Sequence, residues 1–223
     1  LRESLSLSDS QLSLAYMLGT LLAALPLMLV GPLSDRYGLR GISLIAIAML
    51  SAACYFAATV TNFYSLLVAF FLLRFLGQGS LSLLSGNAIS MWFRDRIGRV
   101  SAAMSIGTAI AFAWIPEWLH SCITTIGWRE TYQWLAIIVA ATMLPIVLVL
   151  FCNRPEDIGQ TVDGNDEVPP DQLSDACESS VSCLTLRQAI RCRAFPILAA
   201  SNTVWAMAGT GIIFYLFTLC NDL

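Results

Sequence analysis

One charged residue lies deep inside an apolar stretch of this sequence. Uncharged residues flank Arg74 on both sides, thirty-three before it and nineteen after it. An arginine inside a membrane costs at least about 2.5–3.5 kcal/mol, so it needs a partner or a water-filled cavity. Gln78, Ser82 and Ser85 share its face if the segment is an α-helix. This polar stripe predicts a cavity wall that holds an anion or influences a proton site. The alternative is an arginine bonded to backbone carbonyls of a kinked neighbouring helix.

Two titratable side chains three residues apart form a second candidate site. Glu117 follows Pro116, and His120 lies one helical turn later. An acid and an imidazole at this spacing could transfer protons, because histidine titrates near neutral pH. The same residues beside Trp118 also fit an interfacial anchor at the end of a membrane span, and that interpretation is favoured.

A third candidate is the short charged break at residues 31–40, "GPLSDRYGLR". Gly38 can adopt the left-handed conformation that a tight turn requires, and Gly31 would let another helix approach closely. Asp35 can pair with an arginine or lie at a helix N-terminus, where the helix dipole is favourable for an acid. Breaking such a contact would let helix ends move. Taken alone, a solvated hairpin of about six residues explains the break equally well.

The elements that position these residues follow from composition. The chain is 57% hydrophobic and 12% charged, and its mean hydropathy is +0.71. One soluble core cannot bury so much apolar surface, whereas a bilayer accommodates apolar runs of roughly 20 residues as spanning helices. The uncharged runs predict six spans, at residues 11–33, 41–60, 64–92, 100–126, 131–152 and 195–219. Arg74 then lies about ten residues into the third span, near the membrane midplane at about 1.5 Å per residue.

Arginines predict the orientation, because the sequence contains no lysine. Alternate loops hold nine arginines and the opposite side holds two, Arg2 and Arg129. Positively charged loops stay in the cytosol, so both ends of the chain are expected outside, with at least one further span before Leu1. Residues 153–193 are acidic and contain Pro169 and Pro170, which predicts a flexible cytosolic linker that ends in a short surface helix.

Other patterns concern packing and exclude several classes of function. Small residues at four-residue spacing, around Gly86 and Gly107, predict close helix contacts. The sequence offers no nucleotide-binding loop, no metal cluster, and no serine or cysteine nucleophile beside a histidine. We therefore expect no enzymatic activity, no cofactor or metal, and no nucleic-acid partner.

The charged break also resembles a known signature. The pattern G-x-L-x-D-R-x-G-x-R resembles the loop motif of the major facilitator superfamily, and Leu39 replaces a usual basic residue. The matching residues are Gly31, Leu33, Asp35, Arg36, Gly38 and Arg40. "RFLGQG", residues 74–79, resembles the arginine motif of the superfamily's fourth helix. "WFRDRIGRVSAAMSIG" resembles its turn into the fifth. "GWRETY", "NRPEDIG" and "AGTGIIFY" resemble stretches of monocarboxylate-porter-like and oxalate/formate-antiporter-like members.

This resemblance implies an all-α, polytopic transmembrane bundle in which the six spans are the second to seventh helices of twelve. Residues 1–152 would form most of an N-terminal bundle, 153–193 the linker, and 195–219 the first span of a second bundle that is otherwise missing. The implied function is secondary transport of a small solute, a monocarboxylate or other organic anion, by alternating access with protons as a coupling ion. Gly31, Asp35, Arg36, Gly38 and Arg40 would form a gating loop. A non-transporting receptor or scaffold, or an inactive transporter fragment, is the alternative.

Overall fold

A computed structural model of the chain describes residues 9–151, 196–197, 200–204 and 207–208. Every regular element in these residues is helical, which confirms the predicted fold class. The elements are α2 (Asp9–Tyr37), α3 (Leu39–Ala58), α4 (Phe63–Leu73), η1 (Arg74–Leu81), α5 (Ser82–Trp92), α6 (Ile97–Ile126) and α7 (Trp128–Leu150). The chain divides into two compact units, Leu1–Asp166 and Glu167–Leu223, and each is described by itself.

Five of the six predicted spans are confirmed as helices long and apolar enough to cross a membrane. They cover Ser10–Tyr37, Leu39–Ala58, Phe63–Trp92, Ile97–Ile126 and Trp128–Val149. Helices form here because a chain in lipid must satisfy its backbone hydrogen bonds within the segment. The predicted linker and surface helix at 153–193 lie outside the described residues. So does most of the sixth span, whose described residues are helical.

The turns between the spans are short. The second and third spans are separated at the predicted position, because α3 ends at Ala58 and α4 begins at Phe63. The backbone N–H of Asn62 donates to Ser65 Oγ at 3.0 Å, which satisfies an amide at the start of α4. Gly127 alone separates α6 from α7, with a φ of +89° that favours glycine. Such tight connections hold consecutive spans antiparallel.

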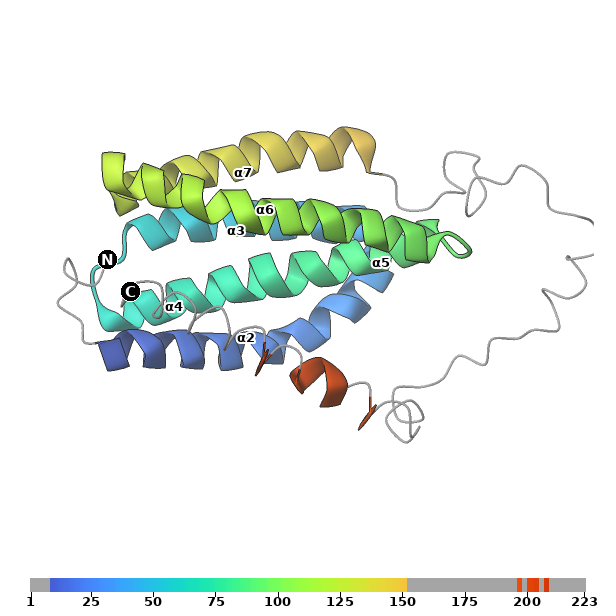
Figure 1. Cartoon of the computed structure of the whole chain (residues 1–223), viewed down its shortest axis with the longest axis horizontal. Coiled ribbons are helices and arrows are strands. Elements are labelled where there is room, and N and C mark those ends of the chain that lie inside the picture. Colours follow the sequence, from blue (N-terminus) through green and yellow to red (C-terminus); the bar gives the residue numbers. More distant parts are fainter. Residues whose placement is uncertain (1–8, 152–195, 198–199, 205–206, 209–223) are drawn as a thin grey trace, which may run out of the picture. The chain divides into compact units, whose positions relative to one another are not determined.

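The helices of the first unit lie side by side along their length (Figure 1). α3 packs most extensively against α7, and α2 against α4 and η1. Two clusters of buried apolar residues lie among α2, α3, α4 and α5: Ala15, Ala57, Val60, Leu66 and Ala69 in one, and Val30, Leu39, Ile42, Ala46 and Leu84 in the other. Leu73 packs against the first cluster and Phe75 against the second. Arg74 therefore lies at the boundary between the two clusters.

Glycine permits close helix approach at Gly19 rather than at the predicted Gly31. A Cβ atom on Gly19 would lie 3.1 Å from both Phe70 Cβ and the Phe71 backbone nitrogen, whereas one on Gly31 would meet nothing within 4 Å. Gly19 lies one turn after Ala15, which is fully buried, on the face of α2 that meets α4. The close helix approach expected at Gly31 is therefore not found among the described residues.

The predicted small-residue contacts are also absent from the described part of the chain. A Cβ atom on Gly86 or Gly107 would meet nothing within 4 Å. α6 has no buried residues, and Trp114 is 77% exposed. Small residues allow close packing but do not by themselves create a neighbour, so these faces of α5 and α6 stay open within the first unit.

Replacing Gly19 with alanine should destabilise the protein by about 1–3 kcal/mol, because the added methyl group would press against the backbone of α4. Gly41→Ala in α3 is the matched control, since a Cβ atom there meets nothing within 4 Å. Thermal unfolding of the purified full-length protein in detergent measures both variants. A Gly19→Ala variant as stable as Gly41→Ala would mean that α2 and α4 do not approach at this position.

Candidate functional site

The third span changes helix type at its centre. η1 is a π-helix, which joins residues five apart by backbone hydrogen bonds and often occurs at functional sites. The side chain of Ser80 follows the same spacing, because its Oγ donates to the Phe75 carbonyl, five residues earlier, at 2.8 Å. Ser80 is only 2% exposed, so this bond satisfies a buried hydroxyl. The wider turns shift the residues that follow away from α-helical register.

Arg74 begins this π-helix and contacts the neighbouring helix α2. Its guanidinium carbon lies 4.4 Å from the centroid of the Tyr16 ring. Tyr16 itself meets Phe70 edge to face, with centroids 5.8 Å apart and an interplanar angle of 81°. A cation over an aromatic face is stabilised by about 0.5–2 kcal/mol, more when it is desolvated. The sequence predicted that Arg74 needs a partner or a water-filled cavity, and the structure shows an aromatic ring as its partner.

Sequence reasoning missed Tyr16, although a signal was present. Tyr16 is the only aromatic residue between Gln11 and Leu33. The sequence does not say which face of α2 meets the third span, and the contact depends on that. A guanidinium that stacks on a ring keeps its N–H donors in its own plane, where they can bind a carboxylate. The pair therefore gives the charge a partner inside the span.

The other members of the predicted polar stripe lie differently from Arg74. Gln78, Ser82 and Ser85 are exposed, whereas Arg74 is half-buried. Ser85 Oγ donates to the Ser82 carbonyl at 3.0 Å, a bond within their own helix. The prediction of one common face assumed α-helical spacing, whereas Arg74 and Gln78 belong to the π-helix η1, and Ser82 and Ser85 follow it in α5.

The predicted six-residue loop is shorter in the structure. α2 continues to Tyr37 and α3 begins at Leu39, so Gly38 alone forms the turn. Its φ is +84°, which confirms the prediction that this position requires a glycine. The charged residues therefore belong to helix ends: Asp35 and Arg36 to the last turn of α2, and Arg40 to the first turn of α3.

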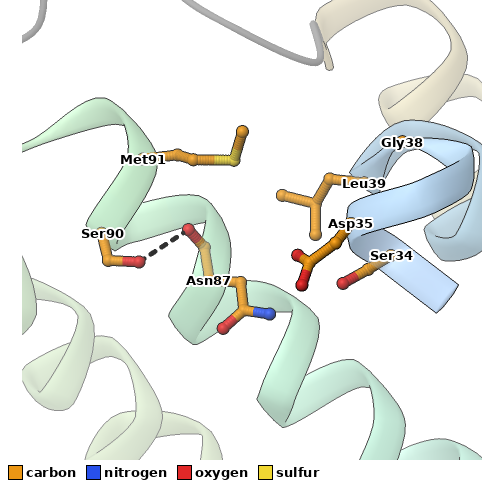
Figure 2. Close-up of a pocket in the computed structure, with 7 residues that line it drawn as sticks. All are labelled: Ser34, Asp35, Gly38, Leu39, Asn87, Ser90 and Met91. Atoms are coloured by element: carbon orange, nitrogen blue, oxygen red, sulfur yellow. Dashed lines mark hydrogen bonds between the residues drawn. The ribbon is translucent and has the colours of Figure 1, made fainter. Parts of the chain in front are cut away.

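Asp35 lines a pocket of about 520 Å³ at these helix ends. Figure 2 shows Asp35 and Ser34 facing Asn87, Ser90 and Met91 of α5 across this pocket. Ser90 Oγ donates to the Asn87 carbonyl at 2.9 Å, and Ser34 Oγ donates to the Gly31 carbonyl at 2.7 Å. The pocket thus joins the end of the first span to the end of the third. Sequence reasoning did not group these residues, because they are more than fifty positions apart.

The two arginines of the predicted gating loop contact other partners. Arg36 lies over the Tyr37 ring, 5.6 Å from its centroid. Arg40 donates a hydrogen bond from Nη2 to the Leu148 carbonyl of α7. The loop residues are therefore directed toward different neighbours, the pocket for Asp35 and α7 for Arg40.

Glu117 and His120 lie on α6, away from the elements that hold Arg74. Both side chains are exposed. The helix continues six residues beyond His120 and contains Pro116. α6 packs against α7 and α5, and the structure does not bring this pair together with Tyr16. Within the described residues, no group of three or more His, Cys, Asp or Glu side chains is placed to hold a metal ion.

Comparisons with known proteins bear on these sites. The model of the Major Facilitator Superfamily matches residues 1–223. The MFS-type transporter oryN of Aspergillus oryzae is 32% identical over 134 residues, which are 59% of this chain and 26% of that protein. The aligned part of the chain therefore covers about a quarter of the length of this curated relative. No solved structure matches the chain.

The contact between Arg74 and Tyr16 can be measured by a double-mutant cycle. Tyr16→Leu and Arg74→Met, alone and combined, should give a coupling energy of about 0.5–2 kcal/mol in the free energy of unfolding. Tyr16→Phe is the matched control, because it keeps the ring and should preserve the coupling. Thermal unfolding of the parent protein and of all these variants in detergent provides the values. A coupling energy of zero would show that the ring does not stabilise the guanidinium.

Proposed function

This chain belongs to the major facilitator superfamily, and from that premise we propose that the full-length protein is a secondary transporter of a small solute. It is a multi-pass integral membrane protein with five helices able to span a membrane in its described part. Carriers of this kind open a central site alternately to each side of the membrane. The proposal also takes the six spans as the second to seventh of twelve helices, with the second bundle supplied by residues outside this chain.

The observation that carries the proposal is the position of Arg74. It lies in the middle of a membrane span, at the start of a π-helix, and its guanidinium stacks on Tyr16. An ionised residue at such a depth is expensive and usually serves the passage of substrates or ions. A structural role alone would be served by an apolar residue at lower cost.

We propose an organic anion, and specifically a monocarboxylate, as the substrate class. A guanidinium binds a carboxylate through two parallel hydrogen bonds, which gives orientation as well as strength. The exposed side chains of Gln78, Ser82 and Ser85 on the same span offer neutral donors and acceptors for the rest of a small polar solute. The competing proposal is a receptor or scaffold that moves nothing, or a fragment without activity, and a transport assay separates the two.

Protons are proposed as the coupling ion, with Glu117 and His120 as the titrating pair. α6 continues well past His120, which supports a place inside the membrane for the pair. This placement favours proton transfer over a role as an interfacial anchor, because titratable groups within a span mark proton pathways.

Arg74→Gln should lower uptake of a labelled monocarboxylate, or raise its KM, by at least about tenfold, because a bond to a charged group is lost. Proteoliposomes that hold the full-length protein provide the measurement, with and without an inward proton gradient. Arg99→Gln is the matched control, because it removes an arginine from the first turn of α6. Uptake equal to that of protein-free liposomes would remove the monocarboxylate proposal. Uptake that is insensitive to Arg74→Gln would remove Arg74 from the mechanism.

The pocket at Asp35 is proposed to act in gating. An exposed acid at the end of α2, facing α5 across the pocket, can attract a helix N-terminus or an arginine that closes the cytosolic side. Opening would then require breaking that contact. Because Gly38 is the only residue between α2 and α3, a movement of one helix end is transmitted directly to the other.

Asp35→Asn should change the balance between inward-open and outward-open states by about twofold or more, since the charge–dipole attraction is lost. A cysteine introduced at Ser90, in a cysteine-free background, reports on the pocket through its labelling rate with an impermeant maleimide. Glu130→Gln, in the first turn of α7, is the control with the same charge change at the opposite membrane face. Identical labelling rates in Asp35→Asn and the parent protein would count against gating.

A further inference from the structure

The junction between η1 and α5 changes the hydrogen bonding of the third span. The turns of η1 pair N–H groups with carbonyls five residues earlier, whereas those of α5 pair them with carbonyls four residues earlier. Where the spacing falls from five to four, successive N–H groups pass over one carbonyl. The skipped carbonyl lies just before the point at which η1 ends at Leu81 and α5 begins at Ser82.

The carbonyl passed over is that of Gln78. In an α-helix its donor would be the N–H of Ser82, four residues later, but that N–H donates to the Gly79 carbonyl. At π-helical spacing its donor would be the N–H of Leu83, which already belongs to the α-helix α5. Main-chain carbonyls without a backbone donor normally find another partner, such as a side chain, water or a ligand. The Gln78 carbonyl is thus an acceptor that neither helix type uses.

This acceptor lies close to the Arg74 site. Gln78 follows Arg74 by four residues, close to one helical turn, within η1. Gln78 and Ser82 are exposed, so the carbonyl between them lies on an open face of the span. Leu76 and Ser80, in contrast, are buried in the same element, which packs against α2 and α3. A solute held by Arg74 therefore meets an unused carbonyl about one turn further along the span.

We propose that the Gln78 main-chain carbonyl is a specificity group of the Arg74 site and accepts a hydrogen bond from an O–H or N–H group of the solute. The proposal rests on the function proposed above, in which the guanidinium binds a carboxylate. The preferred substrate is then a small carboxylate that carries a second group able to donate. A main-chain carbonyl can only accept, so an analogue without the donor leaves it unpaired and binds more weakly.

Binding to the purified full-length protein in detergent tests this preference without transport. 2-Hydroxybutanoate is compared with 2-methoxybutanoate, and 3-hydroxybutanoate with 3-methoxybutanoate, through the ligand-dependent rise in the thermal unfolding midpoint. In at least one pair we expect the hydroxy compound to bind about tenfold more tightly than its methyl ether. Butanoate, which lacks the donor without added bulk, should bind as weakly as the ethers. Equal affinities within both pairs, or no binding of any of these acids, would overturn the proposal.

Side-chain variants separate the carbonyl from its neighbours. The side chains of Gln78 and Ser82 also carry acceptor oxygens, and each could produce the same preference. Gln78→Ala and Ser82→Ala remove these side chains and keep the main-chain carbonyl. We expect the affinity ratio between the hydroxy compound and its ether to persist in both variants, even where both affinities fall. Loss of the ratio in either variant would assign the preference to that side chain and overturn the proposal.

A deletion tests the released carbonyl itself. Removal of Gly77 takes one residue out of η1, so the span can continue as an α-helix in which every carbonyl regains a donor. This variant should stay folded and lose the preference for the hydroxy compound. Deletion of Val68 in the α-helix α4 is the matched control, because it turns all later residues of the span by about 100° and should lower the unfolding midpoint much further.

The two deletions and the uptake assay separate this proposal from the transport function. Equal destabilisation by the two deletions would mean that η1 holds no extra residue, and the proposal would fail even in a protein that transports. A Gly77 deletion that keeps the preference would also overturn it. Preferential binding of the hydroxy compound without uptake in proteoliposomes would support this proposal and contradict the transport function.

Discussion

The organisation of this bundle depends on the charge of Arg74 within an apolar span. A guanidinium there requires a partner, and the partner is the Tyr16 ring of α2. The contact needs α2 and α4 close together, which Gly19 permits by leaving room for Phe70 and the Phe71 backbone. The helix also widens to a π-helix from Arg74 onward, at the boundary between the two apolar clusters. The charge, its ring contact, the close approach at Gly19 and the change of helix type thus lie together in one region of α2, α4 and η1.

The helix ends at the predicted cytosolic surface follow a second constraint. Gly38 is the only residue between α2 and α3, so the charged residues around it are held by helices rather than by a mobile loop. Asp35 faces α5 across a pocket, and Arg40 is hydrogen-bonded to the Leu148 carbonyl of α7. Two charged residues that are close in the sequence therefore lie at two different sites.

Sequence reasoning was most successful where one property decides the structure. The length of apolar runs predicted five spans that the structure confirms, and the need for a positive φ predicted the turn at Gly38. The need of Arg74 for a partner was also predicted, because the cost of an isolated charge in lipid does not depend on the fold. The partner itself, Tyr16, was not predicted, since an apolar helix has no polar face to show which side meets its neighbour.

The sequence by itself determined that this chain spans a membrane repeatedly, roughly where its spans lie, and that Arg74 must be accommodated within one of them. Only the tertiary structure decided which residues meet across helices. It placed the close glycine contact at Gly19 rather than Gly31, and it brought Ser34 and Asp35 to one pocket with Asn87. The reason is that local hydrogen bonding and hydropathy fix a helix, whereas its rotation and its helix type at a given turn depend on the helices packed beside it.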